Sequence, residues 1–440
     1  MRHPSVPLLA VFALVGCAGP SPGVTEYAMD LVWRPSAAMA TSGAVAWAPT
    51  SEVADASVEY GTTTDYGQSA PEVAPGSSVI YGLSPATTYH YRLVGDGWVS
   101  GDETLVTGAA ALGLAPLHLV ESDGSDWGHY LLTTTFVSGQ SGQILVLDPN
   151  LQPVWWSTSP TDFVWSAKFA ADGQSILYLQ GDGGANAKIV RLSLSGEEIA
   201  RYPTPYGRHA FLELPNGDIA YIASDSEVWN GQNVVGDQIV ALSPDGSSRV
   251  LWDSFNDLTP VPAPNWSGST NPLGADWTHC NGLAYDPDTN AFLISSYYLH
   301  SIYKIDAANG DILWQLGGTG SDFTFPDDPG FGPQHSPQFT SDGVLLFDND
   351  QAGTISRVVR YALDANAGVA TRSADYPNPA GGWSATLAYA DTLPGGDIAS
   401  TWAERGEAIV FDPDGAVAWH AQMDTGGMMF GMDVFDSFYH

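Results

Sequence analysis

Basic residues are scarce in this chain, and their scarcity excludes two classes of partner. The 440 residues include 14 Lys and Arg against 49 Asp and Glu, which gives a formal net charge of −35. A surface with that charge repels nucleic acid and anionic lipid headgroups, so we expect neither as a binding partner. Any Lys or Arg side chain in a functional site is therefore conspicuous.

Cysteines and long apolar runs are also few. A short charged start and an apolar stretch from Pro7 to Val15 precede Cys17, which is the layout of a secretory signal too short to cross a membrane. The ending Leu14-Val15-Gly16-Cys17 resembles a bacterial lipobox and implies cleavage before Cys17 and lipidation of its thiol. The alternative is an ordinary signal peptide with an incidental cysteine. With Cys17 lipidated, Cys280 has no partner for a disulfide.

These features predict a lipoprotein signal peptide over residues 1–16 and a tether over 17–24. The mature protein is then an exported bacterial lipoprotein of the cell envelope, on the periplasmic or surface face of a membrane, with the outer membrane favoured. Its lipid is the only membrane contact that we expect.

Long stretches of helical periodicity are absent, and short strands repeat instead. A run of hydrophobic residues that usually ends in a turn occurs six times, opening at Ile144, Ile189, Ile239, Ile302, Val358 and Ala408. About four short strands fall in each repeat. Four-stranded units repeated in this way are typical of a β-propeller, so we predict six blades over residues 115–440. The innermost strands should begin near His129, Ser166, His209, His279, His335 and Ser384, and the apolar Met428–Tyr439 run could close the ring.

Residues 25–107 have a different pattern, with alternating strands and no repeat. The segment Gly82–Leu93 resembles the tyrosine-corner segment of fibronectin type III domains, and the length fits one β-sandwich. We therefore predict an all-β chain with an N-terminal β-sandwich, a linker over residues 108–114 and the propeller. The sandwich is interpreted as a spacer or docking module.

Three histidines occupy one repeated position. His279 precedes Ile302 by 23 residues (302 − 279), and His335 precedes Val358 by 23 (358 − 335). His209 precedes Ile239 by 30 (239 − 209), with a Gly/Asn/Trp-rich insertion accounting for the excess. Equivalent positions in a ring of repeats converge on its axis, so we expect the three imidazoles to lie together at one end of the channel.

Several ordered motifs of the propeller resemble those of the bacterial arylsulfate sulfotransferases. They are Asp276–Asn281, Ile302–Gly318, Phe331–His335, Leu346–Asn349 and His209–Gly217. The resemblance implies an enzyme that moves a sulfuryl group from a phenolic sulfate ester to a phenol, with no nucleotide donor and no other cofactor. It implies that His335 is transiently sulfated and that His209 and His279 are the two supporting histidines. From the chemistry of imidazole we expect His279 to act as general acid and base and His209 to stabilise the sulfuryl oxygens.

One position departs from the family pattern. The family has an arginine 18 residues after the histidine of the Asp-Trp-Thr-His motif, and here that position (279 + 18) is Tyr297. Arg208 and Arg357 are the nearest substitutes in sequence. Tyr297 itself, Asn281 and Trp277 are further candidates for substrate binding. The aromatic residues Trp277, Tyr297, Tyr298 and Trp383 could flank an aryl ring.

Two other interpretations of the histidines stay open. Three imidazoles with a free fourth position also suit zinc or copper, although no flanking carboxylate or short His-x-His pair accompanies them, and we expect no metal. Alternatively, the histidines cap inner strands in a non-catalytic, envelope-anchored propeller that binds an aromatic or protein ligand.

Overall fold

The computed structural model describes residues 25–48, 56–124, 127–137, 141–158, 163–260, 271, 273–326, 328–350, 354–424 and 426–439. The predicted signal peptide, Cys17 and the tether lie outside these residues. The chain forms two units, the first holding most of the strands up to Val106 and the second comprising Pro35–Gly43, Tyr81–Thr87 and Thr107–His440. No helix among the described residues is long and apolar enough to span a bilayer.

The first unit is built from nine hydrogen-bonded strands in the order β1-β8-β7-β4-β5-β6-β3-β2, with β9 also on β7. Their bounds are β1 Thr25–Tyr27, β2 Val32–Pro35, β3 Gly43–Ala46, β4 Ser57–Gly61, β5 Gln68–Ala74, β6 Ser77–Ile80, β7 Thr88–Gly95, β8 Trp98–Ser100 and β9 Glu103–Val106. Burial alternates along β7, where Tyr89, Tyr91 and Leu93 point into the core. The predicted fibronectin type III sandwich stays a prediction for this unit.

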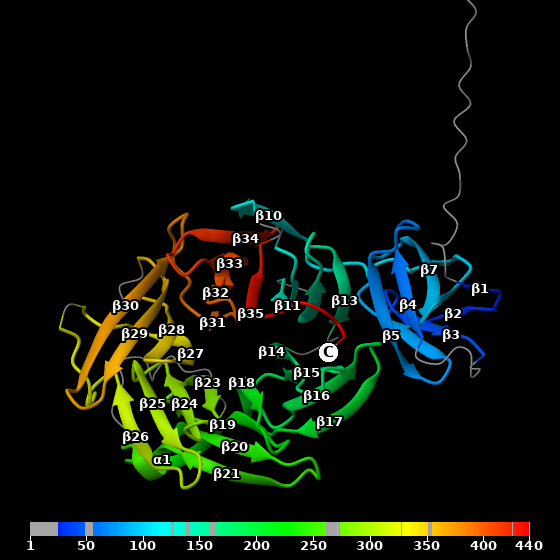
Figure 1. Cartoon of the computed structure of the whole chain (residues 1–440). Coiled ribbons are helices and arrows are strands. Elements are labelled where there is room, and N and C mark those ends of the chain that lie inside the picture. The colour runs from blue at the N-terminus through cyan, green and yellow to red at the C-terminus, as the bar shows by residue number, and fades with distance from the viewer. Residues whose placement is uncertain are drawn as a thin grey trace, which may run out of the picture. The chain divides into compact units, whose positions relative to one another are not determined.

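The second unit is a six-bladed propeller, as the repeats predict. Figure 1 shows its sheets arranged round a common axis, and the innermost strands of neighbouring sheets contact one another. Within the described residues there are six sheets of four or five strands.

Each blade runs outward from an innermost strand next to the axis. Blade 1 is β35 Met428–Phe435, β11 Tyr130–Phe136, β12 Gln143–Leu147 and β13 Pro153–Thr158. Blade 2 is β14 Val164–Phe169, β15 Ser175–Gln180, β16 Lys188–Ser193 and β17 Glu198–Pro203. Blade 3 is β18 Gly207–Glu213, β19 Ile219–Trp229, β20 Gln232–Leu242 and β21 Ser248–Asp253, with β22 Ala275–Asp276 added to β20.

Blades 4 to 6 repeat the arrangement. Blade 4 is β23 Cys280–Asp286, β24 Ala291–Ser296, β25 Ser301–Asp306 and β26 Ile312–Leu316. Blade 5 is β27 Gln334–Thr340, β28 Gly343–Asp348, β29 Arg357–Asp364 and β30 Val369–Pro377. Blade 6 is β31 Tyr389–Thr392, β32 Ile398–Trp402, β33 Glu407–Phe411, β34 Val417–Met423 and β10 Leu117–Ser122. The short helical turns α1 Ser254–Asp257 and η2 Ala403–Arg405 follow β21 and β32.

Turn chemistry separates the strands. The loop between β33 and β34 contains Asp412-Pro-Asp-Gly415, in which the Asp412 side chain accepts hydrogen bonds from the backbone N–H groups of Asp414 and Ala416. Gly415 has a φ of 93°, a left-handed backbone conformation that residues other than glycine rarely adopt. Turn residues of this kind in the sequence therefore mark where the chain reverses direction between neighbouring strands.

The hydrophobic core lies between neighbouring blades. One cluster joins Ile222 and Trp252 of blade 3 to Phe292, Ile294 and Tyr303 of blade 4. The middle strands β12, β15 and β24 are buried along their whole length, because their sheets are covered on both faces. This two-sided burial explains why the sequence shows continuous apolar runs there in place of alternation.

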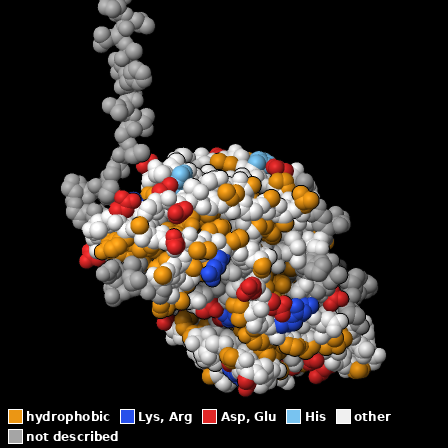
Figure 2. All heavy atoms as spheres, turned by 90° about the vertical axis from the view of Figure 1, so that its right-hand side faces the viewer, with side chains coloured by type: hydrophobic (Ala, Val, Ile, Leu, Met, Phe, Trp, Pro, Cys, Tyr) orange, Lys and Arg blue, Asp and Glu red, His pale blue; other side chains and the backbone are white. Residues whose placement is uncertain are grey.

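The scarcity of basic residues is also visible on the surface. On the face drawn in Figure 2, Lys and Arg side chains occupy few places.

The propeller ring is closed by strands from both ends of the propeller segment. The C-terminal β35 pairs with β11, as the apolar Met428–Tyr439 run predicts, and β10 pairs with β34 of the last blade. The prediction that the innermost strand of blade 1 begins near His129 is wrong, because β35 takes that place and pushes β11 to second position. The second position also explains why His129 precedes Ile144 by only 15 residues (144 − 129).

Candidate active site

The three histidines lie where inner strands are irregular. His209 is on β18, His335 is on β27, and His279 comes directly before β23. The pairing register shifts beside each of them, and His209, His279 and Ser336 have φ values of 60°, 48° and 50°. Positive φ is costly for such residues and persists where the surrounding structure fixes it, often at functional sites.

The structure brings the three rings together. The ring centroids of His209 and His279 are 5.0 Å apart, which is direct contact. Tyr297 connects the third histidine, because its ring lies 5.7 Å from that of His279 and 5.5 Å from that of His335. Tyr298 lies on the other side of His279, at 5.0 Å between ring centroids. The imidazoles are therefore within reach of one small ligand.

A cavity of about 80 Å³ opens beside His209 and His335. Its lining includes Ser166 and Asn281 as well as the two histidines. Among the described residues, Ser166 Oγ, His209 Nε2 and Asn281 Oδ1 are buried and have no hydrogen-bond partner. Buried polar atoms are nearly always paired, so unpaired ones round a single cavity indicate a site for a polar ligand or water.

His335 is held in one tautomer. Its Nδ1 lies 2.7 Å from Asn349 Oδ1, and the Asn349 amide donates to the carbonyl of Ser384 at 2.7 Å, which fixes which end of the amide faces the histidine. Since the amide oxygen can only accept, Nδ1 carries the proton and Nε2 keeps its lone pair. Burial lowers the pKa of His335 to about 4, with His279 adding to the effect and Asn349 opposing it. The imidazole is therefore neutral at pH 7.

His279 is held by a carboxylate. Its Nδ1 lies 2.7 Å from Asp276 Oδ2, and its backbone N–H donates to Asp276 Oδ1 at 3.0 Å. Burial favours the neutral form of Asp276, but the charges of Arg208 and His279 outweigh it and hold the pKa of that carboxyl well below its usual range. The ionised Asp276 orients the ring, and the His279 side chain is 28 % exposed, which suits proton exchange with ligands.

Arg208 is buried and occupied by two carboxylates, so the structure does not favour it as an anion-binding residue. Its Nε and one terminal nitrogen donate to Asp237 at 3.1 and 2.7 Å, and the other donates to Asp276 at 2.8 Å. Asp237 also accepts from the Thr278 hydroxyl and the Cys280 backbone N–H at 2.6 and 2.7 Å. The buried ion pairs of Arg208 with Asp237 and Asp276 therefore fix the backbone round His279.

The insertion that lengthens the His209 repeat builds this support. It extends β19 and β20 into an 11-residue pair, and β20 carries Asp237. The extended β20 also pairs in parallel with β22, where Val235 lies opposite Asp276. Sequence reasoning included Asp276 within a motif but assigned it no role, and it missed Asp237. The signals available were the acidic first residue of the Asp276–Asn281 motif and the acidic residue two positions before the apolar run that opens at Ile239.

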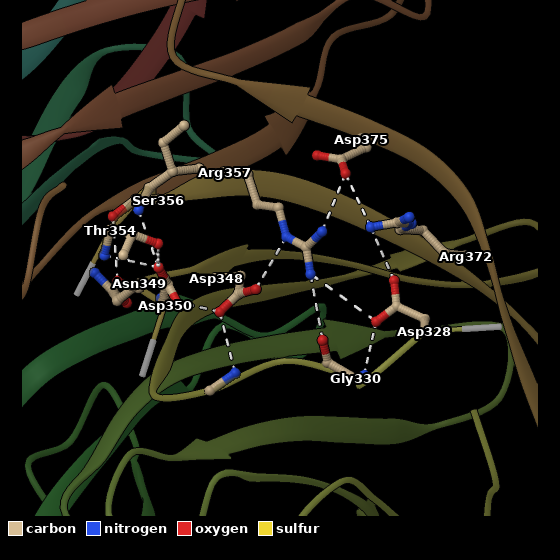
Figure 3. A network of polar contacts seen from close by, with 12 residues as sticks. Asp328, Gly330, Asp348, Asn349, Asp350, Thr354, Ser356, Arg357, Arg372 and Asp375 are labelled. Atoms are coloured by element: carbon tan, nitrogen blue, oxygen red, sulfur yellow. Dashed lines mark hydrogen bonds and ion pairs between the residues drawn. The ribbon is translucent and has the colours of Figure 1, made fainter. Parts of the chain in front are cut away.

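Arg357 is also engaged, in the ion-pair network of Figure 3. Its Nε donates to Asp348 at 3.0 Å and a terminal nitrogen donates to Asp375 at 3.0 Å. Asp348 directly precedes Asn349, the residue that holds His335. Arg357 therefore supports the turn behind the nucleophile candidate, and its guanidinium does not line the cavity.

The aromatic candidates differ in how available their side chains are to a ligand. Trp277 is 1 % exposed and packs on Phe255, so the structure contradicts a direct contact with substrate for it. The Tyr297 hydroxyl donates to the Ala385 carbonyl at 3.0 Å, so Tyr297 contacts the histidines through its ring rather than its hydroxyl. Trp383 is exposed, with its indole N–H on the Asn349 carbonyl at 2.7 Å.

Two residues of blade 2 that line the cavity were not selected by the sequence analysis. Trp165 lies 4.4 Å from His209 between ring centroids and lines the cavity. Lys168, on the same strand, lines it too. Ser166 precedes Ile189 by 23 residues (189 − 166), which is the spacing of His279 and His335 to their own strand runs, and this equality could have pointed to the strand. Among the described residues, no group of three or more His, Cys, Asp or Glu side chains is arranged to hold a metal ion.

The family model for arylsulfotransferase (ASST) matches residues 130–399, which are 270 of the 440 residues (399 − 130 + 1). The chain belongs to the arylsulfotransferase family. The match covers all three histidines, and family membership implies small aryl molecules as substrates.

Solved structures similar to this arylsulfotransferase-family chain have low sequence identity. A protein of unknown function from Bacteroides caccae is 15 % identical with a TM-score of 0.46, over 70 % of this chain and 99 % of its own. TolB from Acinetobacter baumannii is 16 % identical with a TM-score of 0.44, over 81 % and 80 %. A periplasmic gluconolactonase from Pseudomonas aeruginosa is 13 % identical with a TM-score of 0.42, over 70 % and 98 %. No curated protein matches the chain.

Proposed function

We propose that this protein transfers a sulfuryl group from a phenolic sulfate ester to a phenol through a sulfo-histidine at His335. The observation that carries the proposal is the hydrogen bond of His335 Nδ1 to Asn349, which leaves a neutral imidazole with its Nε2 lone pair beside the cavity. Neutral imidazole is a competent nucleophile, and a covalent intermediate divides a difficult exchange into two easier steps.

In the first step, Nε2 of His335 attacks the sulfur atom and the bond from sulfur to the aryl oxygen breaks. The leaving phenolate takes a proton from the imidazolium of His279, which the Asp276 carboxylate stabilises through Nδ1. The arrangement supports this assignment because His279 is the more exposed of the two rings, so an aryl group near it can leave.

In the second step, an acceptor phenol replaces the first. His279 removes the hydroxyl proton, the phenol oxygen attacks sulfur, and the bond from sulfur to Nε2 breaks. His335 returns to its starting tautomer because its Nδ1 proton never leaves Asn349. His279 returns to the imidazolium form, so the cycle consumes no proton and regenerates both histidines.

His209 completes the proposed site as a hydrogen-bond donor. Burial, together with the charges of His279, Arg208 and His335, holds the pKa of His209 well below its usual value, so it acts as a neutral imidazole. Its buried Nε2 has no partner among the described residues and can donate to a sulfuryl oxygen when it carries the ring proton. The ring of Trp165 against His209 offers a surface for the aryl group.

Purified protein supplied with 4-nitrophenyl sulfate tests the proposal. We expect nitrophenol release that depends on added phenol, and its loss in His335→Ala. A matched control is His300→Ala, which lies outside the cavity lining and should keep the wild-type rate. No turnover by the wild type, or an undiminished rate in His335→Ala, would instead support a non-catalytic propeller that binds an aromatic or protein ligand.

We also propose that the mature protein is a lipoprotein of the cell envelope, with the first unit acting as a fibronectin type III-like sandwich that spaces the propeller from the membrane. The support is the lipobox-like ending at Cys17 and the tyrosine-corner segment that ends at Leu93. Fractionation tests the anchor: wild type should partition with membranes, and Cys17→Ser should not carry lipid. A wild-type protein recovered without lipid contradicts the proposal.

A further inference from the structure

A sulfate ester brings a negative charge into a strongly acidic protein, and its transfer needs charge compensation. The two arginines nearest to the histidines in sequence are occupied, Arg208 by Asp237 and Asp276, and Arg357 by Asp348 and Asp375. Among the described Lys and Arg side chains, Lys168 alone lines the cavity that His209 and His335 share.

Lys168 reaches the cavity from the innermost strand of blade 2. Ser166 and Lys168 are two residues apart on β14 and so share one face, while Ala167 between them points into the core cluster between blades 1 and 2. The unpaired hydroxyl of Ser166 lines the same cavity. Ser166 and Lys168 thus line, from one strand, the cavity that His209 and His335 also line.

The surroundings of the ammonium leave it free to meet a ligand. Its Nζ lies 5.9 Å from the ring centroid of Tyr389, a weak cation–π contact. No hydrogen bond or ion pair of Lys168 to another described residue is present. Its charge also interacts with the buried carboxyl of Asp433, which accepts the backbone N–H of Phe169 at 2.8 Å.

One carboxyl group interacts with Lys168 and another with Tyr389, and neither lines the cavity. Asp433 and Asp391, which accepts the Tyr389 hydroxyl at 2.8 Å, are both absent from the cavity lining. Among the described Lys, Arg, Asp and Glu side chains, Lys168 is therefore the one that a ligand in this cavity can meet. The Asp433 carboxyl weakens the attraction of Lys168 for an anion without lining the cavity itself.

We propose that Lys168, with Ser166, binds the sulfuryl group in this cavity and supplies the positive charge that the engaged Arg208 and Arg357 do not provide. The assignment rests on the proposed sulfuryl transfer. In the reaction Lys168 holds the sulfuryl oxygens while His335 attacks sulfur, and it neither gains nor loses a proton.

Inorganic sulfate is the first probe, measured by isothermal titration calorimetry on the full propeller-containing chain. Loss of one hydrogen bond to a charged group should weaken sulfate binding about 10- to 150-fold in Lys168→Met. Lys168→Arg should recover part of it. Asp433→Asn keeps an acceptor for the Phe169 N–H but removes the opposing charge, so sulfate should bind more tightly. Lys304→Met is the matched control, since Lys304 also lies over an aromatic ring, Phe339, but outside the cavity.

Turnover of 4-nitrophenyl sulfate is the second readout. We expect kcat/KM to fall about 10²- to 10³-fold in Lys168→Met, as for removal of one donor from an oxyanion site. Wild-type sulfate affinity and wild-type kcat/KM in Lys168→Met would overturn the assignment while leaving the proposed function intact. Lys168-dependent sulfate binding in a protein with no turnover would support the anion site and remove the sulfotransferase. Wild-type protein that does not bind sulfate, or Lys168→Arg that behaves like Lys168→Met at unchanged thermal stability, also contradicts the proposal.

Discussion

Replacing Asn349 with leucine removes the acceptor that fixes the His335 tautomer. The imidazole proton then distributes over both ring nitrogens, so Nε2 carries a free lone pair only part of the time and the ring can turn. His335 is 4 % exposed, and a buried donor left without a partner costs about 1–3 kcal/mol. At 1.4 kcal/mol per factor of ten, kcat/KM for aryl sulfate should fall about 5- to 150-fold.

The assay is initial-rate turnover of 4-nitrophenyl sulfate with phenol, together with urea unfolding of each variant. Leucine also removes the hydrogen bond from Asn349 to the Ser384 carbonyl, so the free energy of unfolding should drop by about 1–3 kcal/mol for that bond. Rates are therefore measured well below the unfolding midpoint, where the folded fraction is unchanged.

Asn349→Asp is the informative companion. It keeps an oxygen acceptor for Nδ1 but places a negative charge there, which raises the pKa of His335 from about 4. A protonated imidazole cannot attack sulfur, so the acid limb of kcat/KM should move to higher pH. Wild-type kcat/KM in a folded Asn349→Leu protein would refute the argument that the tautomer matters.

Three further predictions rest on packing and on buried charge. Gly282→Ala places a Cβ 2.4 Å from Pro337 Cδ and 2.9 Å from the Ser336 nitrogen, so thermal stability and kcat/KM should both fall, by about 1–3 kcal/mol in stability, whereas Gly395→Ala, with nothing within 4 Å, should change neither. Arg208→Met removes the positive charge that compensates the buried carboxylates of Asp237 and Asp276 and should cost about 3–5 kcal/mol in urea unfolding; a cost near zero contradicts a stabilising role for these ion pairs. Between about pH 6.5 and about 4 the unfolded state binds the proton that buried His335 does not, so the free energy of unfolding should fall as pH is lowered through that window, by up to about 3 kcal/mol. His335→Gln should flatten this part of the pH profile, and an equally steep profile in that variant would show that other groups cause it.

The propeller could be predicted because its signal is repeated. The third strand from the axis in every blade carries the same apolar run, so the prediction of any one blade is supported by the five other copies of the run. Closure by β35 was suggested by an apolar C-terminal run, but the sequence did not show that β35 displaces β11 from the centre. That displacement depends on which chain end pairs with which strand, and local patterns carry no such information.

The candidate site was predicted in part for the same reason. Repeat spacing locates His209, His279 and His335 at equivalent positions, whereas partners such as Asn349 and Asp237 depend on contacts between strands distant in sequence. Arg208 and Arg357 were chosen by proximity in sequence, but each faces carboxylates on neighbouring strands. Lys168 has no motif round it, and only the shape of the cavity distinguishes it from Lys304.

The most direct test of the central claim is to trap the covalent intermediate. Protein mixed with 4-nitrophenyl sulfate in the absence of phenol is digested under mildly alkaline conditions and analysed by mass spectrometry. The account predicts that the peptide containing His335 carries the mass of one sulfuryl group, that phenol added before digestion removes it, and that His335→Ala shows none. An unmodified His335 during active turnover, or a sulfuryl group on His209 or His279 in its place, would contradict the assignment of His335 as the nucleophile.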